Sequence, residues 1–135
     1  MVKINIEYLG DLHCRATHGP SGVSIETDAP KDNQGRGESF SPTDLMATSL
    51  GACIATIMGI VARRHDIDLR GMKVEVIKEM IQQPVRRIGK LSVAFAMPRA
   101  LPPDQRELLE RAARTCPCCL SLHPDVAVAV SFNYP

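Results

Sequence analysis

The sequence predicts a single α+β domain, in which strands group together and one long apolar helix separates two strand regions. Three observations indicate this class. Apolar and polar residues alternate near the N-terminus and again after residue 73, an uncharged stretch of helical length lies between them, and 135 residues suit one domain. Hydrophobic residues make up 44% of the chain and charged residues 23%, as in ordinary globular proteins. We therefore expect one domain over residues 1–135.

Three short strands are predicted before residue 30. Residues 2–8 alternate between apolar and polar side chains, residues 12–18 can return after a turn at Gly10 and Asp11, and residues 23–27 follow a turn cluster. Residues 29–38 are rich in Gly, Pro, Asp and Asn and show no periodicity, so we expect a loop of a length that is often functional. The pattern predicts a three-stranded meander that leads into the main helix.

The main helix has a well-marked start. Ser41 is the expected N-cap, Pro42 the first helical residue and Asp44 the third. No residue from Leu45 to Ala62 is charged, and this stretch is nearly long enough to span a membrane. It contains polar and glycine residues, however, and the sequence has no second such stretch. We therefore expect a buried core helix and no membrane partner. A helix that is apolar all round must be covered all round, so we infer an obligate homodimer. A neighbouring helix could approach along a stripe of small residues: Ala47, Gly51, Ala55 and Gly59.

The second half of the chain predicts a hairpin, a helix and a last strand. Residues 73–79 and 90–96 alternate as paired strands around a basic turn, residues 104–115 form an amphipathic helix, and residues 126–132 alternate again. Pro117 either ends that helix or opens a short second one. In the latter case Cys116 lies at a helix N-terminus, whose amides favour the thiolate.

Composition excludes several classes of function. A formal net charge of +1 argues against a nucleic-acid partner, and the first residues alternate like a strand rather than forming an export signal, which predicts a cytoplasmic protein. Five cysteines in such a protein indicate catalytic, redox or metal-binding roles rather than a disulfide framework, and the odd number supports this.

Two groups of motifs resemble one known family over essentially the whole chain. Residues 41–45 (SPTDL) precede residues 50–53 (LGAC) in the helix, and residues 115–117 (TCP) precede residues 121–126 (SLHPDV). Together they resemble the osmotically inducible protein C / organic hydroperoxide resistance (OsmC/Ohr) family. The resemblance implies an OsmC/Ohr-like α+β fold, with antiparallel sheets around a long buried central helix, in an intertwined homodimer with a site at each end of the interface.

The resemblance also implies thiol-dependent reduction of organic hydroperoxides. Cys53, as thiolate, would attack the peroxide and become a sulfenic acid, Cys116 would condense with it to a disulfide, and an external dithiol would reset the pair. We expect no cofactor and no metal. A cation beside Cys53 would lower its pKa and neutralise the departing oxygen. Arg15 and Arg36 are the candidates for that cation.

One residue departs from the family pattern. Peroxidase members carry a Glu ten residues before the nucleophile, and Thr43 stands there in this chain. Asp44 is adjacent, but one step along a helix rotates the side chain by roughly 100°, so it is no obvious substitute. The alternative function is therefore a redox sensor or small-molecule binding protein that lacks efficient peroxidase turnover.

A metal-binding protein is a third hypothesis, with ligands between Cys116 and His123. The adjacent Cys118 and Cys119 do not match the usual Cys-x-x-Cys zinc motif, and we interpret them as incidental or as spare resolving thiols. Cys14 lies in a predicted strand and is expected to be structural. His123 is expected to shape the turn before the last strand.

Overall fold

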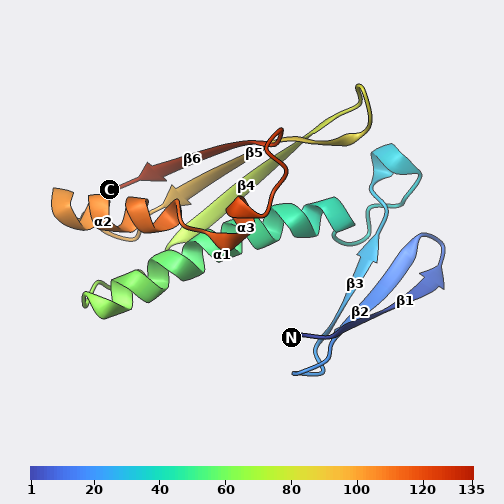
Figure 1. Ribbon diagram of the computed structural model, residues 1–135, viewed down its shortest axis with the longest axis horizontal. Helices are drawn as coiled ribbons and strands as arrows, with labels where there is room; N and C mark the ends of the chain where they lie inside the picture. The colour runs from blue at the N-terminus through green and yellow to red at the C-terminus, as the bar shows by residue number, and fades with distance from the viewer. The chain divides into compact units, whose positions relative to one another are not determined.

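The computed structural model describes residues 1–135 and divides the chain into two compact units, residues 1–46 and 47–135. The first unit holds strands β1 (Ile4–Gly10), β2 (His13–His18) and β3 (Ser24–Asp28), followed by a short 3-10 turn, η1 (Lys31–Asn33). The strands pair antiparallel in the order β1-β2-β3, as Figure 1 shows. The predicted three-stranded meander is confirmed.

The first sheet is amphipathic. Ile6 pairs with Ala16, and Ala16 pairs with Ile25, so alternate residues of all three strands share one face. The apolar face carries Ile4, Ile6, Tyr8, Cys14, Ala16 and Ile25. The other face is polar and includes the Arg15–Glu26 pair. The apolar residues of β1 remain exposed in the chain, with Ile6 at 68%.

The loop after β3 is anchored by one buried carboxylate. The Asp28 Oδ2 atom accepts hydrogen bonds from the backbone N–H groups of Arg36 and Glu38, at 3.2 and 3.0 Å. The backbone N–H of Asp28 donates to the Phe40 carbonyl. The loop predicted over residues 29–38 is thus held at both ends and contains η1.

Helix α1 (Pro42–Arg64) begins where the sequence predicts. The Asp44 N–H donates to the Ser41 hydroxyl at 3.1 Å, and the Ser41 N–H donates to the Asp44 carboxylate at 2.9 Å. This reciprocal capping box satisfies two backbone groups that would otherwise lack partners. Arg63 and Arg64 lie in the last turn, where their charge complements the helix dipole.

The second unit contains a sheet with strands β4 (Lys73–Ile81), β5 (Arg87–Ala96) and β6 (Ala127–Asn133), in that order. Strands β4 and β5 form the predicted antiparallel hairpin, but β6 runs parallel to β5, so the expectation of purely antiparallel sheets is wrong. The connection explains the difference. It passes through helices α2 (Pro103–Ala113) and α3 (Pro117–Leu120), and a crossover of that kind returns the chain to the end where β5 began (Figure 1).

Helix α1 packs on this sheet along one side only. Leu50, Ile54 and Met58 are at most 1% exposed. A Cβ atom on Gly51 would lie 2.7 Å from the Val76 Cγ2 atom of β4, so glycine permits this close approach. The small-residue stripe at this level therefore meets the chain's own sheet, which corrects the prediction of a neighbouring helix there.

The opposite side of α1 is exposed in the single chain, at Thr48, Ala52 and Thr56 among others. By length and composition α1 could cross a membrane, with a mean hydropathy of 2.0, and a third of that window is buried inside the protein. Its buried residues join one hydrophobic core with β5 and α2, as in the core helix of a small soluble domain.

Candidate functional site: a three-thiol cluster

Two elements of the second unit present the cysteines of the site. Cys53 lies in the middle of α1 and is partly buried. Pro117 takes the first position of α3 because its fixed φ suits a helix start, and Cys116 immediately precedes it as N-cap. Cys116 is fully buried at 0% exposure, whereas Cys118, in the first turn of α3, is partly exposed.

The fold brings three sulfur atoms together. The Sγ atoms of Cys53, Cys116 and Cys118 all lie within 4.8 Å of one another. Cys53 and Cys116 are 63 positions apart in the sequence, so only packing of α3 against α1 places them side by side. A disulfide bond between two of them would require the sulfur atoms to approach to about 2.05 Å.

Hydrogen bonding favours the thiolate form of Cys53. Burial raises the pKa of the Cys53 thiol, but donors from the Cys116 thiol, the Cys118 amide N–H and the Cys118 thiol outweigh it, and the net pKa is lowered. In its own unit the Cys53 thiolate is therefore stabilised by thiol and amide donors. Of the three clustered thiols, Cys53 is the one whose ionisation its surroundings favour.

Cys116 behaves in the opposite way. Burial, and then its hydrogen bond to Cys53, raise the pKa of Cys116 to about 11. The N–H groups of Cys119 and Cys118 lower it by less. Pro117 does open a short helix, and its N–H groups favour the Cys116 thiolate as expected, but desolvation and the hydrogen bond to Cys53 outweigh them. At neutral pH Cys116 is a protonated donor.

Cys118 was interpreted as incidental or as a spare resolving thiol, and its place in the cluster favours the second alternative. Burial and its hydrogen bond to Cys53 raise the pKa of Cys118, while the Ser49 hydroxyl, one turn before Cys53 on α1, lowers it. The signal in the sequence was the Cys-Pro-Cys spacing. Proline at the first helical position puts the cysteines on either side of it into the same turn.

The remaining sequence candidates lie outside the cluster. Cys119 lines a separate hollow, and Cys14 lies on the apolar face of the first sheet. His123 pairs with Asp125, which donates its N–H to His123 Nδ1 at 3.1 Å, as expected of a residue that shapes the turn before β6. A metal cluster built from Cys119 and His123 is not assembled.

The two candidate cations belong to the N-terminal unit and each has an acidic partner there. The Arg15 Nη2 atom lies 2.8 Å from Glu26 Oε1, and the Arg36 Nη1 atom lies 3.7 Å from Glu38 Oε1. Both arginines are exposed, Arg36 at 69%. Their role beside Cys53 stays a prediction.

The residues around the missing family Glu serve the helix start. The Thr43 hydroxyl lies 3.2 Å from the Ser41 hydroxyl, and the Asp44 carboxylate accepts the Ser41 N–H. Asp44 thus closes the capping box of α1.

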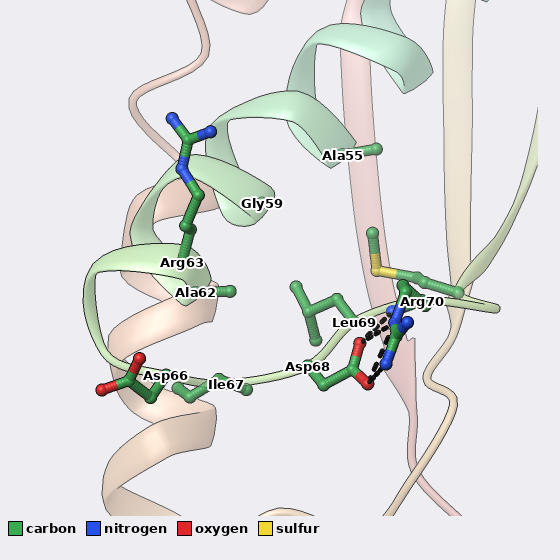
Figure 2. Close-up of a pocket in the computed structure, with 10 residues that line it drawn as sticks. Ala55, Gly59, Ala62, Arg63, Asp66, Ile67, Asp68, Leu69 and Arg70 are labelled. Atoms are coloured by element: carbon green, nitrogen blue, oxygen red, sulfur yellow. Dashed lines mark hydrogen bonds and ion pairs between the residues drawn. The ribbon is translucent and has the colours of Figure 1, made fainter.

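Two hollows in the second unit lie apart from the thiol cluster. The larger, about 650 Å³, opens beside the last turns of α1, where the small residues Ala55, Gly59 and Ala62 leave space (Figure 2). At its edge the Asp68 carboxylate faces the Arg70 guanidinium at 2.8 Å. The smaller, about 300 Å³, is lined by Ile54, Cys119 and residues of α2 and β6. Cys53, Cys116 and Cys118 line neither.

Comparison with known proteins decides the family. The family model described as OsmC-like protein matches residues 35–131. The chain belongs to the OsmC-like family. A crystal structure from Psychrobacter arcticus 273-4, provisionally named as an osmotic stress induced and detoxification response protein, shares 43% identity over 98% of this chain and 96% of that one, with a TM-score of 0.93. Comparison with the curated proteins gives no match.

More distant OsmC-like structures share the fold. An organic hydroperoxide resistance protein OsmC from Legionella pneumophila is 17% identical over 98% of this chain and 96% of its own, with a TM-score of 0.75. The organic hydroperoxide resistance protein OhrB of Bacillus subtilis is 16% identical over 98% of each chain, with a TM-score of 0.73. The resemblance found in the sequence is confirmed, as is the α+β fold with a long helix and two three-stranded sheets.

Proposed function

We propose that the protein is a thiol-dependent peroxidase that reduces organic hydroperoxides through Cys53 and Cys116. The observation that carries the proposal is the lowered pKa of Cys53 beside two protonated thiols within 4.8 Å. A thiolate is the nucleophile in peroxide reduction, and a nearby thiol is needed to resolve the product. The distant relatives named for organic hydroperoxide resistance support this class of substrate.

The proposed reaction balances with the groups of the cluster. The Cys53 thiolate attacks the distal peroxide oxygen, the O–O bond breaks, and the products are a Cys53 sulfenic acid and an alkoxide. The alkoxide takes the proton of the Cys116 thiol and leaves as the alcohol. The Cys116 thiolate then attacks the sulfenic sulfur and releases hydroxide, which forms the disulfide. An external dithiol exchanges with this disulfide and restores both thiols.

Cys118 supplies a second resolving thiol. It contacts Cys53 as Cys116 does but is less buried. A disulfide that includes Cys118 is therefore easier for an external dithiol to reach, because exchange depends on access to the attacked sulfur. Cys118 can resolve Cys53 directly or accept the disulfide from Cys116.

Peroxide turnover with cysteine variants tests the proposal. Reduction of cumene hydroperoxide with a dithiol is expected to fall to background in Cys53→Ser and to persist, more slowly, in Cys116→Ser, where Cys118 resolves. The double variant Cys116→Ser/Cys118→Ser should oxidise once and stop. Cys14→Ser is the matched control and should retain full turnover. Slow formation of a Cys53 disulfide without turnover in the wild type would favour the redox sensor instead.

Variants of Arg15 and Arg36 test whether either arginine is the cation beside Cys53. Arg15→Ala and Arg36→Ala are expected to lower kcat/KM and to raise the pKa of Cys53 if either guanidinium stabilises the thiolate and the departing oxygen. Unchanged pH profiles in both variants would remove the two arginines from the mechanism.

We also propose a homodimer in the cytoplasm. The exposed apolar face of the first sheet and the uncovered side of α1 are the surfaces that a second copy would bury. A reducing compartment would keep the five free cysteines as thiols. Sedimentation at micromolar concentration should show a dimer, and a stable folded monomer would exclude it.

A second candidate function rests on the three clustered thiols. Three cysteine sulfur atoms within 4.8 Å can bind a thiophilic ion such as Zn²⁺ once the thiols lose their protons. Metal analysis of the purified protein separates this candidate from the peroxidase. One equivalent of zinc that disappears in Cys118→Ser would support it, and substoichiometric zinc would exclude it.

A further inference from the structure

A second group of possible metal ligands lies on the polar face of the first sheet. His13 begins β2, Asp28 ends β3, and the two are paired across the sheet. Glu38 comes from the loop that Asp28 anchors. The His13 Nε2 atom lies 3.7 Å from Asp28 Oδ1 and 3.3 Å from Glu38 Oε2. None of the three belongs to the thiol cluster.

The Asp28 carboxylate has an unused oxygen atom directed into this group. Its side chain is 0% exposed, and Oδ2 accepts the two loop N–H groups. Oδ1 is buried and has no hydrogen-bond partner. Buried polar atoms almost always have a partner, and an ionised oxygen has the strongest need of one. The position of Oδ1 therefore calls for a cationic occupant between Asp28 and His13.

The orientation of His13 fits a metal ligand. Its Nδ1 atom lies 2.7 Å from the Asp11 carbonyl oxygen, which can only accept a hydrogen bond, so Nδ1 carries a proton. In the neutral ring this leaves the lone pair of Nε2 directed at two carboxylate oxygens. A histidine whose second nitrogen donates to a backbone carbonyl is the usual arrangement of a metal-bound imidazole.

We propose that His13, Asp28 and Glu38 bind a divalent first-row transition metal ion, with Zn²⁺ as the representative. Ligand atoms about 2.1 Å from a tetrahedral ion lie about 3.4 Å from each other. The observed separations of 3.3 and 3.7 Å lie on either side of that value. One imidazole and two carboxylates suit zinc, and the half-exposed Glu38 leaves the fourth position open to water. The ion would tie the loop before α1 to the first sheet.

Arg36 and a proton on His13 could each affect metal binding at this site. The Arg36 guanidinium lies 3.7 Å from Glu38 Oε1, which leaves Oε2 for the ion. A proton on His13 Nε2 is the alternative occupant, because it too would bridge the ring to both carboxylates. The experiment must therefore distinguish a metal ion at this site from a proton and from a metal held by the cysteines.

Cobalt makes both distinctions. We would titrate the metal-free, reduced, full-length protein with Co²⁺ and follow binding by equilibrium dialysis and absorption, because thiolate ligands add an intense sulfur-to-metal charge-transfer band. One equivalent of Co²⁺ should bind without that band. Its Kd should rise at least about tenfold in Asp28→Asn. Asparagine keeps a carbonyl oxygen for the two loop N–H groups, so the loop stays anchored while the ligand oxygen is lost.

Two further variants keep the test decisive. Glu38→Gln changes a half-exposed ligand and should weaken Co²⁺ binding as well. Glu26→Gln removes a carboxylate from the same face that is paired with Arg15 and should leave binding unchanged. The proposal is overturned if all bound Co²⁺ shows the sulfur band, or if Asp28→Asn binds Co²⁺ as tightly as the wild type. It is equally overturned if the protein binds no Co²⁺.

Discussion

Two glycines of α1 predict opposite effects of the same substitution. Gly51 faces β4, where an added Cβ would lie 2.7 Å from Val76 Cγ2 and 3.4 Å from Val74 Cγ1. Gly59 lies two turns further along the same helix, and an added Cβ there meets nothing within 4 Å. Gly51→Ala and Gly59→Ala thus share their chemistry and their helix and differ in the space available.

The magnitudes follow from two effects. Replacing a helical glycine by alanine stabilises a helix by about 0.8–1 kcal/mol. At Gly59 this is the whole effect, so the free energy of unfolding should rise by about that amount. At Gly51 a Cβ would collide with Val76, and overpacking of a core costs about 1–3 kcal/mol. The gain is therefore cancelled or exceeded, and Gly51→Ala should be destabilised by up to about 2 kcal/mol.

Urea denaturation followed by circular dichroism measures the difference between the two variants. We expect their free energies of unfolding to differ by about 1–3 kcal/mol, with Gly59→Ala the more stable. Because Gly51 lies two residues before Cys53, Gly51→Ala should also alter the pH at which Cys53 is alkylated. Equal stabilisation of both variants would refute the close packing of α1 on β4 and with it the placement of Cys53.

Three further predictions concern titrating groups. Because Cys118 donates hydrogen bonds to the Cys53 thiolate, Cys118→Ala should raise the pKa of Cys53 and move its alkylation by iodoacetamide to higher pH, whereas Cys119→Ala should not. Hydrogen bonds from a neighbouring arginine hold the pKa of Asp68 well below its usual range. The stability it adds is present above the unfolded value of about 3.9 and lost as pH falls through the folded value, so Asp68→Asn should flatten the acid side of the urea-midpoint profile. Burial and a hydrogen bond to a glutamate raise the pKa of Tyr134 to about 12, so ultraviolet titration should show a late phenolate that Tyr134→Phe removes, and stability should fall between about pH 10 and that value.

Much of the fold follows from local patterns. Alternation identified the strands, and the Ser41, Pro42 and Asp44 cluster identified the start of α1, because caps and periodicity depend on neighbouring residues. The direction of β6 did not follow, since a strand has the same period of two whether its partner is parallel or antiparallel. Only the route through α2 and α3 decides it.

The candidate site was predictable only in part, because some of its properties depend on contacts between residues far apart in the sequence. The motifs pointed to Cys53 and Cys116, but the position of the thiolate depends on burial and on which donor faces which sulfur, and neither is visible in a linear sequence. For Cys118 the sequence left an incidental residue and a spare resolving thiol as alternatives, because an extra cysteine beside a motif has no pattern of its own. His13 was not singled out because its partners Asp28 and Glu38 are distant in sequence and meet it only through sheet pairing and the loop.

The crossover that makes β6 parallel to β5 also carries α3. Cys116 and Cys118 can reach α1 only after the chain has passed through α2 and α3. During synthesis, or after local unfolding of the sheet, Cys53 would lose its donors and revert to the sluggish reactivity of an ordinary thiol. Cys53 would therefore react rapidly with oxidants only in the folded protein, and a chain that has not finished folding would be oxidised more slowly.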